Sequence, residues 1–267
     1  RPLILNELIN KINSKFIFYY HNDPLTMSGS KLTSERIEIL KKVDKLIFIS
    51  EWVKKRFFIG LDNNLTSKTQ IIYHSVYKQK IQKKFKQITF VGKLNEAKGY
   101  DIFKDAIQKI LEKYPQWTAF SIGDESRRKI YINHKQHTEL GFLSHKKTLD
   151  ILSKSEIAVV PSRWEEPFGR VALEAATCGC ATIISNRGGL PETSEHSIVL
   201  KNNDPNNLYK EIKKLIDNNQ KRKKIQSLSR NNIKHQILRN TKKIDFIRNE
   251  IVPAFNLNFL KKKLKIV

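Results

Sequence analysis

The chain has 267 residues, of which 50 are Lys or Arg and 26 are Asp or Glu, so its formal net charge is +24. Hydrophobic residues make up 39% of the chain and are spread along it, which excludes an intrinsically disordered protein and leaves room for one or two packed domains. Only two cysteines occur, so a disulfide framework is excluded and a four-ligand zinc site is not supported.

Up to about residue 75, short apolar runs alternate with helical patterns, which is typical of parallel α/β units. Strands are predicted at 15–20, 45–50 and 70–73, and helices at 34–42 and 51–58. Residues 76–86 lose this pattern and are predicted to be an interdomain linker. Three strands are few for a complete domain of this kind, so this part resembles the second half of one.

A longer α/β series follows the predicted linker. Its predicted strands are 87–91, 118–122, 138–142, 157–160 and 181–185. Its predicted helices are 99–113, 146–153, 169–177, 208–217 and a stretch after 221 that Pro253 ends or kinks. The sequence therefore predicts two parallel-sheet domains, in which ligands bind at the carboxyl ends of the strands.

The segment 161–179, PSRWEEPFGRVALEAATCG, places a turn and then a helix after a predicted strand, with the helix beginning near Phe168 or Gly169. The first amides of a helix have no partners inside it, so they can hold a phosphate, and Gly169 lets a ligand approach the backbone. Glu166 and Glu174 lie on roughly the same side of this helix. A carboxylate accepts hydrogen bonds from two neighbouring hydroxyl groups. The spacing predicts one carboxylate for a sugar, one for a ribose and a diphosphate between them.

Carboxylates near a helix start can instead stabilise the helix dipole, and this interpretation is favoured for Glu165. It does not apply to Glu174, which lies too far along the helix. The small and apolar neighbours of Glu174 predict that it is buried, where a carboxylate needs a partner. Cys178 and Cys180 are predicted to be small core residues at the end of the helix.

In this order, the motifs resemble the E-x7-E signature of glycosyltransferase family 4, the retaining enzymes of the GT-B fold. Three further parts are similar to the segments that flank this signature: FVGKLNEAKG at 90–99, residues 141–144 with 155–162, and GCATIISNRGGLPE at 179–192. The resemblance covers nearly the whole chain and implies an α/β fold with two Rossmann-like domains.

The domain boundaries that the resemblance implies are as follows. Residues 1–77 form a partial N-terminal domain on the acceptor side, and residues 78–238 form the nucleotide-sugar-binding domain. Residues 239–267 form a C-terminal crossover helix that returns toward the first domain, with a basic tail. The strand and glycine-rich loop with which family members open have no match, so we expect the chain to lack the first part of its N-terminal domain.

The resemblance also implies roles for single residues. Lys93 and Lys98 lie where basic residues of the family neutralise the donor diphosphate, which suits a leaving group that gains negative charge; two solvated lysines are the alternative. His21 resembles the histidine that faces the reacting sugar, and capping a turn is its alternative. Catalytic roles are thus predicted for His21, Glu166 and Lys98. The predicted donor-binding residues are Lys93, Lys98, Gly123, Leu143, Glu166, Phe168, Gly169, Arg170 and Glu174.

The implied activity is transfer of a sugar, with retention, from a UDP- or GDP-sugar to a glycan or a lipid-linked glycan. The implied pathway is the biosynthesis of cell-envelope polysaccharide or lipopolysaccharide. We expect neither a cofactor nor a metal site, because the basic residues and helix amides would neutralise the diphosphate. A truncated, non-catalytic protein that binds nucleotide sugars or polyanions is the alternative.

The excess of lysine is spread over nearly every segment, which indicates a compositional bias more than a designed patch. Without an RNA-binding aromatic motif or a helix-turn-helix pattern, no nucleic-acid partner is predicted. The cysteine content and the lack of an apolar run of about 18 residues predict a cytoplasmic protein. The tail 258–267, NFLKKKLKIV, is either a frayed terminus or a peripheral contact with an anionic membrane.

Overall fold

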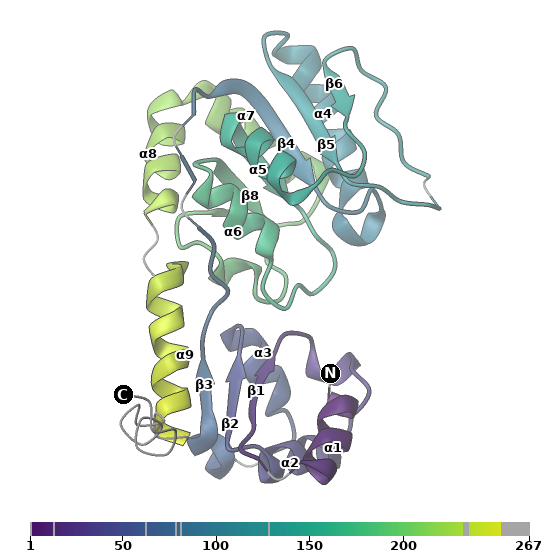
Figure 1. Cartoon of the computed structure of the whole chain (residues 1–267). Coiled ribbons are helices and arrows are strands. Elements are labelled where there is room, and N and C mark those ends of the chain that lie inside the picture. Colours follow the sequence, from purple (N-terminus) through teal and green to yellow (C-terminus); the bar gives the residue numbers. More distant parts are fainter. Residues whose placement is uncertain are drawn as a thin grey trace, which may run out of the picture. The chain divides into compact units, whose positions relative to one another are not determined.

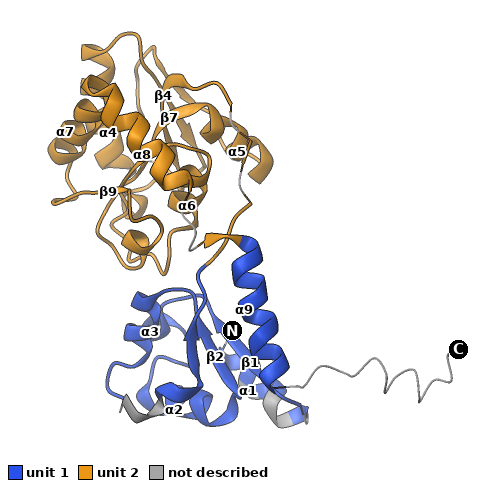
Figure 2. Cartoon of the chain, turned by 90° about the vertical axis from the view of Figure 1, so that its left-hand side faces the viewer, with its two compact units in different colours: residues 1–73, 237–267 blue, residues 74–236 orange. Residues whose placement is uncertain are grey.

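The computed structural model describes residues 2–12, 14–61, 63–77, 79–80, 82–127, 129–231 and 235–251. The chain divides into two compact units (Figure 2): unit 1 comprises residues 1–73 and 237–267, and unit 2 comprises residues 74–236. Each unit contains one parallel β-sheet with helices packed against it (Figure 1). The predicted α/β class with two parallel sheets is confirmed.

Unit 1 is built on a three-stranded parallel sheet in the order β1-β2-β3. Its strands are β1 (Ile17–Tyr20), β2 (Lys45–Phe48) and β3 (Thr69–Ile71). Its helices are α1 (Pro2–Lys11), α2 (Thr33–Lys42), α3 (Glu51–Phe57) and α9 (Ile237–Ile251), with short 3-10 helices η1 (Pro24–Thr26) and η2 (Asn63–Lys68). Ile247 of α9 is fully buried against Ile47 and Ile72, so a helix from the far end of the sequence completes this core.

Unit 2 contains a six-stranded parallel sheet in the order β6-β5-β4-β7-β8-β9. The strands are β4 (Phe85–Val91), β5 (Thr118–Ile122), β6 (His137–Glu139), β7 (Ser155–Val160), β8 (Ala181–Ile184) and β9 (Ile198–Val199). The helices are α4 (Tyr100–Lys113), α5 (His145–Lys154), α6 (Arg170–Thr177), α7 (Pro205–Asp217) and α8 (Asn219–Arg230), with η3 (Glu96–Lys98) and η4 (Leu190–Glu192). Within the unit this is the strand order 3-2-1-4-5-6, which reverses direction between β4 and β7. Ligands of doubly wound sheets bind at the carboxyl ends of the two strands beside such a reversal.

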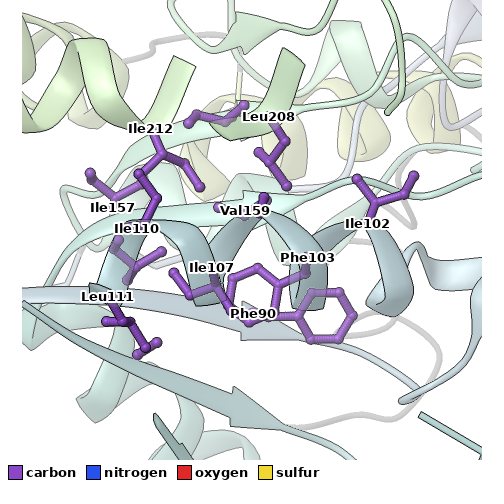
Figure 3. Close-up of a cluster of buried hydrophobic side chains, with 14 of the residues drawn as sticks. Phe90, Ile102, Phe103, Ile107, Ile110, Leu111, Ile157, Val159, Leu208 and Ile212 are labelled. Carbon is purple, nitrogen blue, oxygen red and sulfur yellow. The ribbon is translucent and has the colours of Figure 1, made fainter. Parts of the chain in front are cut away.

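The core of unit 2 follows the alternation of side chains along its central strands. Ile157 and Val159 of β7 point to one face, where they pack with apolar residues of α4 and α7 (Figure 3). Ala158, between them, packs on the opposite face with Leu152 of α5 and Ala175 of α6. Burial of each large aliphatic side chain stabilises the fold by roughly 1.5–3 kcal/mol. The apolar side chains of the central strands thus pack against helices on both faces of the sheet. The loops that follow the strands lie at the carboxyl ends of the sheet.

Lys84, just before β4, joins the C-terminal ends of two helices. Its ammonium group donates to the carbonyl oxygens of Leu152, Ser155 and Cys178, at 3.3, 2.9 and 2.7 Å. Carbonyl groups at helix ends lack partners inside the helix and carry partial negative charge. Burial lowers the pKa of Lys84. Cys178 and Cys180 are buried beside it, which confirms that they are small core residues.

Several elements differ from the prediction. The strand expected at 138–142 ends at residue 139, because Gly141 turns the chain with a φ of +63°. The expected linker 76–86 overlaps the first residues of β4, and α1 and β9 were not predicted. Pro253 and the tail 258–267 lie outside the described residues. Among the helices that the structure describes, none is long and apolar enough to cross a membrane.

Candidate functional site

Two loops meet at the carboxyl ends of β4 and β7, where the strand order reverses. They are residues 92–99, after β4, and residues 161–169, after β7. The carbonyl oxygen of Ala97 accepts hydrogen bonds from the backbone N–H groups of Arg163 and Trp164, at 3.0 and 2.9 Å. Gly99 has a φ of +71°, and a Cβ atom there would come within 1.9 Å of the carbonyl oxygen of Pro161. The loops are therefore fixed to each other by backbone contacts.

A charged pair crosses between these loops. Nζ of Lys98 lies 2.5 Å from Oε1 of Glu166, and the hydroxyl of Ser162 lies 3.1 Å from the same oxygen. Their side chains are 33% and 16% exposed for Lys98 and Glu166, so both can still meet a ligand. The structure thus brings two predicted site residues into direct contact. Side by side they offer a cation for a phosphate oxygen and an acceptor for a hydroxyl group.

The loop after β8 is hydrogen-bonded to the loop after β7. The backbone N–H of Gly188 donates to Oε2 of Glu165 at 2.6 Å, and the N–H of Gly189 donates to the carbonyl oxygen of Glu166 at 2.6 Å. The predicted role of Glu165 as a helix cap is wrong, because α6 begins only at Arg170 and Gly169 is its N-cap. Glu165 instead positions the loop that carries Gly188.

Glu174 lies in a second cluster on α6. It is 6% exposed, and its Oε1 accepts hydrogen bonds from Nε of Arg170 at 2.8 Å and from Nε2 of His145 at 3.0 Å. The prediction that Glu174 is buried and needs a partner is confirmed. His145 is not among the predicted site residues, because its contact with Glu174 depends on how two helices pack. The sequence signal for His145 is its place directly after Ser144, the N-cap of α5, at the start of a helix.

The remaining donor-binding candidates of unit 2 lie on the loops that follow β4, β5, β6 and β7. Gly123 follows β5 with a φ of +139°, and a Cβ atom there would lie 1.9 Å from the carbonyl oxygen of Gly92. Lys93 is exposed on the loop after β4, and Leu143 is half-buried between β6 and α5. Phe168 is 2% exposed, so its ring is a packing element and only its backbone remains for a ligand.

His21 belongs to unit 1, where it follows β1. Its ring lies 4.4 Å from the ring of Tyr19, and partial burial lowers the pKa of His21. The turn that follows is capped by Asp23, whose Oδ1 accepts a hydrogen bond from the N–H of Leu25 at 3.1 Å. Arg56 pairs with Asp23 at 2.8 Å, so the loop behind His21 is held in place.

The chain is similar to known glycosyltransferases. The family model described as glycosyl transferases group 1 matches residues 75–232. An uncharacterized glycosyltransferase of Methanocaldococcus jannaschii is 32% identical over 191 residues, which are 67% of this chain and 52% of that protein. An uncharacterized protein from the cps region of Klebsiella pneumoniae is 28% identical over 216 residues, which are 72% of this chain and 58% of that protein. The chain therefore spans about half the length of the curated relatives it matches.

A solved structure supports the fold. The crystal structure of Anabaena HepE in complex with UDP matches with a TM-score of 0.75 and 20% sequence identity, over 88% of this chain and 72% of that one. At this level of identity the likeness concerns the fold.

Proposed function

Because the chain belongs to the group 1 glycosyl transferases, we propose that it carries the donor site of an enzyme that transfers a sugar from a nucleotide diphosphate sugar to an acceptor. The observation that supports this most is the contact between Lys98 and Glu166, 2.5 Å apart at the reversal of strand order. A donor of this class presents a diphosphate beside a ring rich in hydroxyl groups. The pair offers one partner for each.

In the proposed reaction, the bond between the anomeric carbon and the diphosphate oxygen breaks, and the nucleoside diphosphate leaves with the electron pair. The acceptor hydroxyl forms the new bond to the anomeric carbon and passes its proton to an oxygen of the departing diphosphate. Negative charge grows on the diphosphate as it leaves, so fixed cations stabilise the transition state. We assign this role to Lys93 and Lys98, together with the amides at the start of α6 around Gly169.

The carboxylates bind the hydroxyl groups on either side of the diphosphate in this proposal. Glu166 binds the sugar, because its carboxylate contacts the Lys98 ammonium group, which we assign to the diphosphate. Glu174 binds the ribose from its place further along α6. Gly123, Leu143 and the backbone of Phe168 complete the donor site. We assign His21 to the reacting sugar, and the pKa of His21, lowered by partial burial, favours a neutral imidazole that can donate one hydrogen bond.

The proposal also covers the stereochemistry of the transfer, the donor and the acceptor. We propose that the anomeric configuration is retained and that the chain belongs to glycosyltransferase family 4, because the E-x7-E spacing of Glu166 and Glu174 resembles the signature of that family. A UDP- or GDP-sugar is the proposed donor, and the related fold solved with UDP favours the first. A glycan or lipid-linked glycan is the proposed acceptor, and the relative from a cps region favours envelope polysaccharide.

We also propose that the protein works at the cytoplasmic side of a membrane through a peripheral contact. Helix α9 leaves Leu238 and Phe246 76% and 64% exposed, with Lys242 between them in the sequence. Exposed apolar side chains beside basic ones favour adsorption to an anionic lipid surface. The free cysteines, Cys178 and Cys180, suit a reducing compartment.

A thermal-shift panel of UDP-, GDP- and ADP-sugars tests the donor site. A ligand that binds only the native state raises the melting temperature with its concentration. Lys98→Ala and Glu166→Ala should remove the shift, whereas Lys201→Ala, an exposed lysine after β9, should keep it. If no nucleotide sugar stabilises the unsubstituted chain, the proposal fails.

Release of the nucleoside diphosphate in the presence of acceptor then separates the enzyme from its alternative. Turnover that Glu166→Ala abolishes supports the transferase. Stabilisation by nucleotide sugars without any turnover would favour the non-catalytic binder.

A further inference from the structure

The cluster around Glu174 contains a histidine to which the proposed function gives no role. Nε2 of His145 lies 3.0 Å from Oε1 of Glu174, and Nε of Arg170 lies 2.8 Å from the same oxygen. His145 is the first residue of α5, and Arg170 is the first residue of α6. Two helices therefore hold one oxygen of one carboxylate.

The exposure of the three side chains shows which of them is being held. The side chain of Glu174 is 7% exposed, whereas those of His145 and Arg170 are 56% and 62% exposed. A carboxylate with so little contact with water needs hydrogen-bond donors around it. His145 can supply one only if Nε2 carries a hydrogen, as in one neutral tautomer and in the charged ring.

The two donors act on the same oxygen. In the part of the chain that the structure describes, the hydrogen bonds to the Glu174 carboxylate both end on Oε1. Oε2 thus keeps its lone pairs for another donor, and fixing Oε1 fixes the direction of Oε2. A site that hydrogen-bonds a particular hydroxyl group discriminates strongly against an analogue without it.

We propose that His145 is a positioning residue that orients Glu174 toward the ribose hydroxyl groups, and so sets the preference of the site for ribonucleotides over deoxyribonucleotides. This inference rests on the proposed function, which assigns Glu174 to the ribose. Arg170 acts on the same oxygen from within α6. His145 belongs to another helix, so the direction of the Glu174 carboxylate also depends on where α5 lies.

The test compares ribo- and deoxyribonucleotides on matched variants. The probes are UDP, GDP and ADP, each with its 2′-deoxy and 3′-deoxy forms, and the measurement is the dissociation constant by calorimetry. We expect the unsubstituted chain to prefer the ribonucleotide it binds by about 10- to 100-fold, the range for hydrogen bonds to a charged group. His145→Ala should reduce that preference to about threefold or less. Because Arg170 still donates to Oε1 of Glu174 and His145 itself is more than half exposed, this change should lower the melting temperature only slightly.

Two further variants make the result specific. His145→Gln should keep most of the preference, because the glutamine amide can place an N–H donor near the position of Nε2. Lys146→Ala, the next and exposed residue of α5, should keep all of it. In a Glu174→Gln background, where the preference is already lost, His145→Ala should change nothing more.

The outcomes separate this inference from the proposed function. If His145→Ala weakens ribo- and deoxyribonucleotides equally, or keeps the full preference, His145 does not position Glu174 and only the inference fails. If the unsubstituted chain binds both kinds equally well, the assignment of Glu174 to the ribose fails as well. If it binds none of the three nucleotides, the proposed function fails and the inference falls with it.

Discussion

Nζ of Lys98 lies 2.5 Å from Oε1 of Glu166, so a lysine that ends one loop and a glutamate from the middle of another form a single ion pair. The two residues are 68 positions apart in the sequence. They meet because β4 and β7 are neighbours in the sheet. Any change to one residue therefore changes the electrostatic surroundings of the other.

This pairing predicts a non-additive double-mutant cycle. We expect Lys98→Met and Glu166→Gln each to lower turnover of a nucleotide sugar by about 100-fold or more, the usual loss when a group that stabilises transition-state charge is removed. The double variant should be about as slow as the slower single variant, because the pair acts as one unit. Additive losses, measured as kcat/KM, would show that the two residues act independently.

Gly99→Ala should destabilise the protein more than Gly141→Ala. Both glycines have a left-handed φ, +71° and +63°, which costs about 1–2 kcal/mol for another residue. A Cβ atom at Gly99 would also lie 1.9 Å from the carbonyl oxygen of Pro161, whereas one at Gly141 would meet no atom within 4 Å. Urea unfolding should show a further loss of about 2 kcal/mol or more for Gly99→Ala, the scale of an overpacked site. Equal losses would mean that the loops after β4 and β7 can separate freely.

Lys84→Met should lower the free energy of unfolding by about 2–4 kcal/mol, because several carbonyl groups at helix ends lose their donor. Lys86→Met is the matched control, since Lys86 is exposed on the same segment. The two variants can be compared by urea unfolding at pH 7. A similar small effect for both would show that water replaces the Lys84 ammonium without cost.

The pKa of His21 is lowered by partial burial, and this gives stability a definite pH dependence. The unfolded chain binds a proton at the ordinary histidine pKa of about 6.5, while the folded chain binds it only at lower pH. Between these two values the unfolded state holds more protons, so stability falls as the pH falls through 6.5 toward the folded pKa. His21→Gln should reduce the loss of stability between pH 7.5 and 5.5. An NMR titration that puts the His21 pKa at or above 6.5 would contradict this prediction.

Much of the fold could be read from the sequence because its signals are local. The apolar runs at Ile157–Val160 and Ala181–Ile184 are buried on both faces of the sheet, and such runs predict central parallel strands. β9 has only two residues, and a run that short carries no period to detect. Its place in the sheet depends on pairing with β8, which the sequence does not display.

The candidate site was predictable where its residues follow strand ends, as Lys98 and Glu166 do. The partners of those residues were not, because they depend on how distant segments pack. Glu165 is an example: its place near a helix start predicts a charge that stabilises the helix dipole. In the structure it instead accepts a hydrogen bond from the N–H of Gly188 on another loop. His145 shows it too, since only the packing of α5 beside α6 brings it to Glu174.

The core of unit 1 is interrupted in the sequence. Unit 1 is formed by residues 1–73 and by a second segment that begins at residue 237. Ile247, which covers Ile47 and Ile72, belongs to the second segment. During synthesis at roughly 5–20 residues per second, the early strands must wait on the order of ten to thirty seconds for that helix to leave the ribosome. Unit 2 is continuous and can mature in the meantime. Until α9 has been made, a nascent chain therefore leaves Ile47 and Ile72 without the helix that covers them in the folded unit.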